Sequence, residues 1–202
     1  MRDPEFLPVM ESFYTIQGEG YYSGTPAYFV RLGGCDVGCH WCDVKESWDA
    51  SKFEWVHVNK IVDGAKSSGA ELVVITGGEP FIYDLSALTQ TLQANGLLTN
   101  VETSGAYRLS GQWDWICFSP KKFKEPKPEF FEKANELKVV VYNRSDLDWA
   151  EGHSNKMGAK AKRYLQPEWS REKEMTPLIV DYIKERPKWR ISLQTHKYMD
   201  IP

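Results

Sequence analysis

Apolar and polar positions follow one another along the chain in blocks that predict strands alternating with helices. Seven short runs rich in β-branched or aromatic residues are predicted to be buried strands, namely residues 27–32, 71–76, 98–103, 115–119, 137–142, 163–166 and 189–194. Several of them are apolar on both faces, as expected of parallel strands covered by helices.

Three segments have the spacing of amphipathic helices, at residues 56–68, 85–94 and 177–185. Asp84 precedes the second as a predicted N-cap and Gly96 follows its end, while Thr176 and Pro177 form a favoured N-cap and first-turn pair for the third. About six to seven strands thus share about three main helices. This pattern predicts an α/β fold with a mostly parallel sheet, curled into an incomplete TIM-like barrel. Ligands of such sheets bind at the carboxyl ends of the strands.

Length and composition indicate one globular domain. The chain has 202 residues, 42% of them apolar, and no Gly-, Pro- or Ser-rich linker divides it. Residues 1–6 (MRDPEF) look like a translated cloning linker and are left out of the structural prediction, so the expected domain covers residues 7–202.

Charge and hydropathy exclude two classes of partner. The 25 Lys and Arg against 28 Asp and Glu give a net charge of -3, which disfavours direct binding of DNA or RNA. No apolar run approaches the roughly 20 residues that cross a bilayer, and no signal peptide is evident. We therefore expect a cytoplasmic protein that binds neither nucleic acid nor membrane.

Three of the four cysteines form a C-x3-C-x2-C pattern, Cys35, Cys39 and Cys42, in the loop after the first predicted strand. Nearby glycines allow the backbone to curl around one metal centre. A 4Fe–4S cluster held by three thiolates leaves one iron free for a substrate or cofactor, which accounts for the absence of a fourth cysteine from the motif.

Two other interpretations of this motif are open. A structural zinc needs a fourth protein ligand, which would have to be His40, His57, His153, His196 or Cys117. A redox dithiol at Cys39 and Cys42 leaves Cys35 unexplained. Cys117 lies within an apolar strand pattern and is predicted to be a core residue.

A second motif, Gly77-Gly78-Glu79-Pro80, follows the apolar strand at residues 71–76. The glycines allow a close backbone approach to a ligand, and Glu79 with nearby carbonyls can accept hydrogen bonds from an ammonium group. By itself the motif is equally typical of a tight strand-to-helix turn.

Together the two motifs resemble the radical S-adenosylmethionine (SAM) superfamily. Further segments at residues 14–20 (YTIQGEG), 29–35, 102–105, 119–121, 165–167 and 192–197 are similar to the 7-carboxy-7-deazaguanine synthase family, from about residue 12 to residue 202. The resemblance implies a carbon–nitrogen lyase that converts 6-carboxy-5,6,7,8-tetrahydropterin to 7-carboxy-7-deazaguanine with loss of ammonia, in queuosine and 7-deazapurine biosynthesis.

The resemblance also implies roles for residues. Cys35, Cys39 and Cys42 would hold the 4Fe–4S cluster that generates a 5′-deoxyadenosyl radical from SAM, which is later reformed. The implied substrate-binding residues are Gln17, Glu19, Arg31, Thr76, His196 and Pro202. The implied SAM-binding residues are Gly77, Gly78, Glu79, Glu102, Ser104, Ser119, Lys121 and Gln166.

The chain departs from the family at one position. Members commonly carry a hydroxyl residue two places after the third cysteine, where it binds Mg²⁺, but this chain has Val44. Mg²⁺ would have to bind through Asp43, substrate oxygens or water. We therefore expect weaker Mg²⁺ stimulation than is usual for the family.

The family expectation for partners is a flavodoxin or ferredoxin as electron donor and a second copy of the chain in a homodimer. Another radical SAM enzyme, such as a glycyl-radical-activating enzyme, shares the cysteine spacing and is the alternative activity. A zinc-binding interaction module is the alternative that involves no catalysis.

Overall fold

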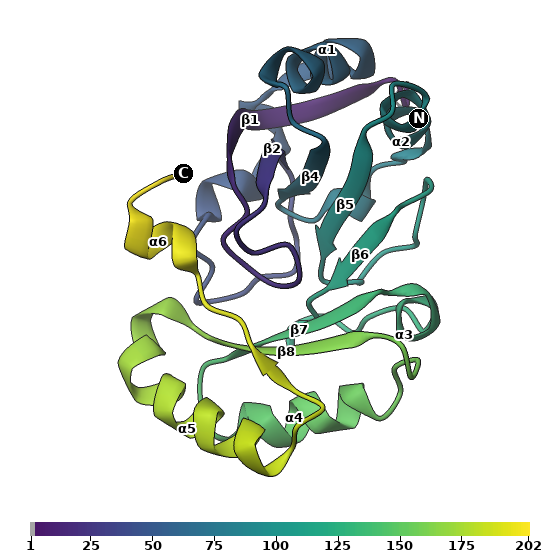
Figure 1. Cartoon of the computed structure of the whole chain (residues 1–202). Helices are drawn as coiled ribbons and strands as arrows, with labels where there is room; N and C mark the ends of the chain where they lie inside the picture. The colour runs from purple at the N-terminus through teal and green to yellow at the C-terminus, as the bar shows by residue number, and fades with distance from the viewer. Residues whose placement is uncertain (1–2) are drawn as a thin grey trace.

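The computed structural model describes residues 3–202 and shows one open nine-stranded sheet (Figure 1). In chain order the strands are β1 (Phe6–Ile16), β2 (Pro26–Leu32), β3 (Glu54–His57), β4 (Leu72–Gly77), β5 (Leu98–Thr103), β6 (Trp115–Phe118), β7 (Glu136–Val141), β8 (Lys162–Pro167) and β9 (Arg190–Ile191). Their spatial order is β3-β1-β2-β4-β5-β6-β7-β8-β9. The β1 strand pairs antiparallel with β2 and β3, and all pairs from β2 to β9 are parallel.

Six α-helices accompany the sheet within residues 3–202: α1 (Val58–Ser68), α2 (Ser86–Ala94), α3 (Glu129–Lys133), α4 (Ser145–Ser154), α5 (Glu172–Glu185) and α6 (Thr195–Met199). The α1 and α2 helices lie beside the first strands, and α4 and α5 cover the outside of β7–β9 (Figure 1). No helix in this part of the chain is long and apolar enough to cross a membrane.

The predicted α/β fold with a mostly parallel, unclosed sheet is confirmed, but the predicted six to seven strands are too few. The sequence pattern missed β1 and β3, which pair with each other along one edge of the sheet. The alternation of apolar and polar residues in β1 is interrupted at Pro8. The pairing of β1 with β2 also shifts register between Val9 and Glu11. Phe6 is already part of β1 and pairs with His57, so the strand begins inside the segment that the prediction left out.

The predicted three helices are also too few. The Thr176–Pro177 pair does not start a helix, because α5 begins at Glu172 and includes both residues. The α4 helix was missed because few of its residues are apolar and buried, namely Leu147 and Ala150. Of the cues around α2, Gly96 is confirmed, with φ +74° just beyond the end of the helix. The predicted N-cap is wrong by one residue: Leu85 is the N-cap, and Asp84 before it accepts a hydrogen bond at Oδ1 from Ser86 N at 2.9 Å.

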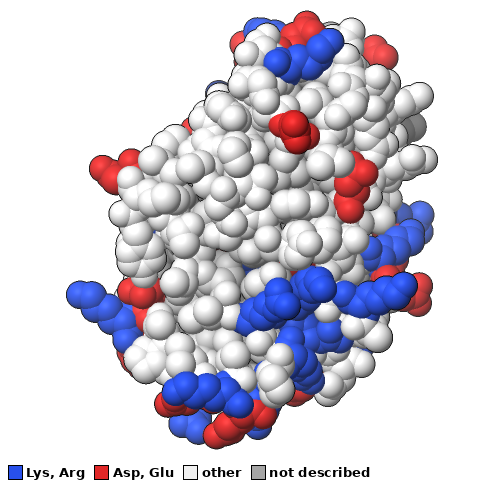
Figure 2. Space-filling view, in the orientation of Figure 1, with Lys and Arg blue, Asp and Glu red and all other residues white. Residues whose placement is uncertain are grey.

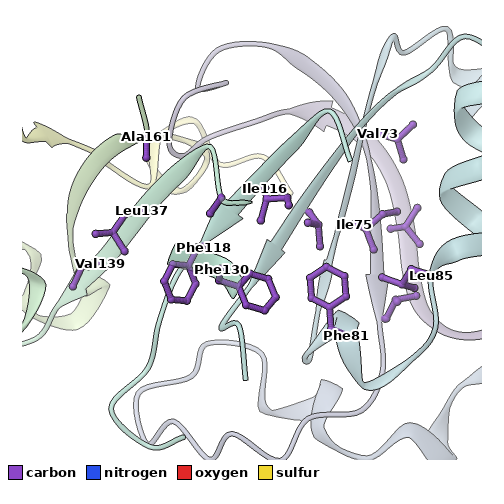
Figure 3. Packing of buried hydrophobic residues seen from close by; sticks show 14 of the residues in the cluster. Val73, Ile75, Phe81, Leu85, Ile116, Phe118, Phe130, Leu137, Val139 and Ala161 are labelled. Carbon is purple, nitrogen blue, oxygen red and sulfur yellow. The ribbon is translucent and has the colours of Figure 1, made fainter. Parts of the chain in front are cut away.

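The hydrophobic core lies between the outer face of the sheet and the helices. Figure 3 shows Phe118 and Phe130 beside each other, with ring centroids 5.6 Å apart, and Phe81 next to them. Other strand residues of this core include Val73, Ile75, Leu137 and Val139.

The inner face of the second half of the sheet is polar, contrary to the expectation of strands that are apolar on both faces. Glu136, Lys138 and Gln166 are each at most 3% exposed, and they alternate along β7 and β8 with the core residues Leu137, Val139 and Leu165. Burying polar groups is costly unless they are paired. Because the barrel is incomplete, its concave side can hold a site rather than a second apolar layer.

The surface carries charge of both signs, in keeping with the small net charge. On the face shown in Figure 2, basic side chains gather over the lower half with acidic ones among them, while most of the upper half is uncharged apart from scattered acidic side chains and a group of both signs at the top.

Candidate active site

A single cavity of about 260 Å³ lies at the carboxyl ends of the strands. It collects residues from distant parts of the chain, and every residue that the sequence suggested for the site lines it. These are Gln17, Glu19, Arg31, Cys35, Cys39, Cys42, Asp43, Thr76, Gly77, Gly78, Glu79, Glu102, Ser104, Ser119, Lys121, Gln166, His196 and Pro202. Cys117 is not among them; it is 3% exposed in β6, as predicted for a core residue.

The cysteine loop follows β2 and forms one wall of the cavity. Cys39 is buried and Cys35 and Cys42 are partly exposed, and all three are free thiols. Burial raises the pKa of the Cys39 thiol to about 11, although Lys121 acts in the opposite direction. Three soft thiols on one wall, with no fourth cysteine at the cavity, fit a 4Fe–4S cluster held at three corners.

The Gly-Gly turn is pressed against the backbone that leads into this loop. Gly77 has φ +127°, and a Cβ at Gly78 would lie 2.1 Å from the carbonyl oxygen of Gly34. Gly78 N donates to Leu32 O at 2.8 Å, and Glu79 N donates to Gly34 O at 2.9 Å. The glycines are therefore needed because two backbone segments lie in close contact. The sequence analysis had instead explained them by a close approach of the backbone to a ligand.

Glu79 fastens the turn to the end of β5. It is 1% exposed, and its carboxylate accepts hydrogen bonds from Thr103 Oγ1 at 2.6 Å, Phe81 N at 3.2 Å and Ser104 N at 2.8 Å, as well as from Ser104 Oγ. A carboxylate has about four acceptor positions. Since protein donors use them all, Glu79 holds the turn and Ser104 in place.

Two carboxylates and one ammonium group form a buried network that also lines the cavity. Lys138 Nζ donates to Glu102 Oε2 at 3.1 Å and also to Glu19 Oε2. Gln17 Nε2 donates to Glu102 Oε1 and Gln194 Nε2 to Glu19 Oε1, each at 2.9 Å.

The network fixes the charge of Glu19. Burial by itself would raise the pKa of this carboxyl group, but the Lys138 charge and the hydrogen bonds from Lys138 and Gln194 outweigh it and lower the pKa to about 2. Sequence reasoning missed Lys138. The available signal was a lysine inside the otherwise apolar run LKVVV of a predicted buried strand.

Arg31 and His196 lie at the same cavity. Arg31 Nε donates to Glu11 Oε1 at 2.6 Å, and Glu11 is a second residue that the sequence analysis missed. Burial lowers the pKa of His196 below its ordinary value, despite the nearby Glu19 carboxylate, and this favours a neutral ring. Thr195 N donates to Gly18 O at 3.0 Å, which holds α6 against the loop between β1 and β2 (Figure 1).

The remaining polar residues are linked in pairs. Lys121 Nζ donates to Ser119 O at 2.8 Å and Ser119 Oγ at 2.6 Å. Ser192 Oγ donates to Gln166 Oε1 at 2.7 Å and accepts from Gly20 N at 2.9 Å. These bonds join the ends of β6 and β8 to the loops around the cavity.

The residues near the cysteine loop do not fit a Mg²⁺ site. Val44 lines the cavity and offers no side-chain oxygen, and its carbonyl oxygen accepts from Ser47 Oγ at 2.7 Å. Asp43 Oδ2 lies 3.0 Å from Lys197 Nζ. Among residues 3–202, no three His, Cys, Asp or Glu side chains are grouped to hold a single metal ion, and this includes the three cysteines, whose proposed ligand is a cluster of several irons. Mg²⁺ prefers several hard oxygen ligands.

Comparisons with known proteins show the family of this chain. Residues 16–156 match the family of 4Fe-4S single cluster domains, which favours an iron–sulfur centre over the zinc module. The 7-carboxy-7-deazaguanine synthase of Flavobacterium psychrophilum is 56% identical over 98% of this chain and 94% of its own length. The synthase of the same name from Synechocystis sp. is 46% identical over 96% and 93%.

A solved structure is similar over almost the same range. The crystal structure of QueE from Escherichia coli superposes with a TM-score of 0.83 at 33% identity and covers 93% of both chains. Its similarity supports the assignment of the open, TIM-like sheet. The sequence relatives, the iron–sulfur domain and this structure together show that the chain is a member of the 7-carboxy-7-deazaguanine synthase family.

Proposed function

We propose that the protein converts 6-carboxy-5,6,7,8-tetrahydropterin to 7-carboxy-7-deazaguanine and releases ammonia, using a 4Fe–4S cluster and SAM. The observation that carries this proposal is the meeting of three cysteines, the Gly-Gly turn and a charged polar wall in one cavity. The family relationship selects this reaction over that of a glycyl-radical-activating enzyme.

The cysteine side of the cavity would serve the cofactors. Cys35, Cys39 and Cys42 would hold the cluster, which with SAM supplies one-electron chemistry when bound. The carbonyls of the turn at Gly77 and Gly78 are suited to the amino group of SAM, since the Glu79 carboxylate is already occupied by protein donors. The resemblance assigns Ser104, Ser119, Lys121 and Gln166, which also line the cavity, to the same cofactor.

The opposite side would serve the pterin. Its ring presents an amide N–H and an amino group, donors that carboxylate oxygens such as those of Glu19 accept well. Arg31 can pair with the substrate carboxylate through the guanidinium nitrogens that do not contact Glu11. His196, Thr76 and the C-terminal Pro202 complete this side. Glu102 bonds Gln17 and Lys138, so we assign it to this group.

The proposal extends to partners. An external reductant must supply an electron, for which a flavodoxin or ferredoxin in the cytoplasm is suitable. A homodimer is the assembly that the family leads us to propose.

The test is a turnover assay with the anaerobically reconstituted, reduced protein, SAM and 6-carboxy-5,6,7,8-tetrahydropterin, followed by mass spectrometry. We expect 7-carboxy-7-deazaguanine to form without matching net loss of SAM. Accumulation of 5′-deoxyadenosine with no deazaguanine would contradict the proposed substrate but leave a radical SAM enzyme. An intact cluster that gives neither product would contradict the catalytic assignment.

Removing Mg²⁺ is expected to change turnover little, because Val44 provides no ligand and Asp43 is paired with Lys197. We expect less than roughly threefold stimulation when Mg²⁺ is added back to chelator-treated protein. Val44→Thr restores a hydroxyl oxygen and is expected to increase that stimulation. Complete loss of turnover on chelation, reversed by Mg²⁺ alone, would refute this prediction.

A further inference from the structure

Lys138 is a buried cation that the mechanism outlined above does not use. It is 3% exposed on the inner face of β7, and it lines the cavity between Glu19 and Glu102. Its ammonium group donates to one oxygen of each carboxylate. Removing an ammonium group from water costs several kcal/mol, so its place here requires both partners.

The two carboxylates are held at both of their oxygens. Lys138 binds one oxygen of each, while Gln194 and Gln17 donate to the other oxygens of Glu19 and Glu102, respectively. Each carboxylate thus accepts two side-chain hydrogen bonds from the protein. About two of its four acceptor positions are left for a ligand. The group of two carboxylates and one ammonium carries a formal charge of -1, which favours a ligand edge composed of N–H donors.

We propose that Lys138 is a positioning residue that holds the carboxylates of Glu19 and Glu102 together as a pair of acceptors, and that this pair selects the amino-bearing edge of a pterin ring. The inference rests on the proposed function and adds the element that discriminates between ring types. A lumazine ring carries a carbonyl oxygen where a pterin carries its amino group. The lumazine carbonyl oxygen would face a carboxylate oxygen, and because both atoms are acceptors they would form no hydrogen bond and would repel each other.

The test measures binding of 6-carboxypterin and 6-carboxylumazine to the reconstituted, SAM-loaded protein by ligand fluorescence. The wild-type protein is expected to prefer the pterin by at least ~100-fold, as sites built around hydrogen bonds to a substrate N–H do. Lys138→Gln is expected to lower the affinity for 6-carboxypterin by at least ~30-fold and to reduce the preference for 6-carboxypterin over 6-carboxylumazine below ~10-fold. Its affinity for SAM is expected to stay within about twofold of the wild-type value. Lys138→Arg keeps the charge and is expected to retain the preference.

The matched control is Lys184→Gln on α5, where the lysine side chain is 70% exposed. It makes the same change of residue away from the cavity, and no change in binding of either ring is expected. Circular dichroism and thermal melting of each variant report on the fold separately from ligand binding.

The pH profile provides a readout that a purely structural role would not alter. The titratable groups around Glu19 are Lys138, Glu102, His196 and Lys121, from four separate segments. With its pKa at about 2, Glu19 stays ionised in the wild-type protein from pH 9 to pH 5. In Lys138→Gln the raising effect of burial is no longer offset by the ammonium, so 6-carboxypterin affinity should fall toward pH 5 more steeply than in the wild type. His196 interacts with Glu19 and titrates in both proteins, so the readout is the difference between the two pH profiles.

Wild-type pterin affinity in folded Lys138→Gln would overturn the inference. So would an equal loss for pterin, lumazine and SAM with the wild-type pH profile, because that result indicates a structural role alone. If Lys138→Gln does not fold, Lys138→Arg decides: retained discrimination supports the inference, and lost discrimination overturns it. A wild-type protein that binds SAM but neither ring would instead overturn the proposed substrate, and this inference with it.

Discussion

Replacing Cys39 with alanine is expected to abolish turnover, with a loss of at least ~1000-fold, and to remove most of the bound iron and sulfide. Cys39 is one of three thiols on a single wall of the cavity, and no fourth cysteine lines the cavity to replace it. A cluster held at two corners should be lost during reconstitution. Iron and sulfide analysis together with the turnover assay measure both effects.

Cys117→Ala is the matched control, since it also removes a thiol. Cys117 lies in β6, and its Sγ is 3.4 Å from Glu136 Oε1, away from the cavity wall. We expect an unchanged iron content, with a stability loss of about 1 kcal/mol. Iron bound equally by the Cys39→Ala variant and the wild-type protein would contradict the assignment of the cysteine loop.

Gly78→Ala is expected to have the second largest effect, because the new methyl group would lie 2.1 Å from Gly34 O. The two nearest atoms belong to the Gly34 backbone and the third is Cys35 Cβ, so the turn and the segment leading to Cys35 must separate. Overpacking of this kind costs about 2 kcal/mol or more, which corresponds to a Tm lower by about 4–8 °C for a chain of this size. SAM binding, measured by calorimetry, should weaken at the same time.

Gly152→Ala provides the comparison at a glycine with open space around it. Gly152 lies inside α4, and no atom is found within 4 Å of the position its Cβ would take. Alanine is favoured over glycine in a helix, so we expect stabilisation of about 0.5–1 kcal/mol and unchanged SAM binding. If both variants melt at the wild-type temperature, close backbone packing at the Gly-Gly turn does not contribute to stability.

The positions of the residues within the two cofactor motifs could be predicted well from the sequence. Cys35, Cys39 and Cys42 are separated by three and two residues, so the loop itself brings them to one wall. The Gly77-Gly78-Glu79 turn could be placed for the same reason, since it follows a strongly apolar strand. Local spacing determines such features without knowledge of distant contacts.

The roles of single side chains could not be predicted in the same way. The sequence suggests Glu79 as a ligand for an ammonium group, but its carboxylate binds Thr103 and Ser104, which follow it by 24 and 25 residues. Arg31 shares its guanidinium with Glu11, which lies on a strand that the pattern did not reveal. These pairings depend on the strand register, which only the folded sheet provides.

The sequence by itself determined the α/β class, the cysteine loop, the turn and the family resemblance, because each rests on local pattern or on motifs in order along the chain. The tertiary structure decided the nine-stranded order, the start of α5 and the pairing of Lys138 with Glu19 and Glu102. Lys138 is 119 residues from Glu19 and 36 from Glu102. A lysine in a buried strand is costly until the fold brings both carboxylates to it, so the reason for its presence lies in contacts that no local pattern contains.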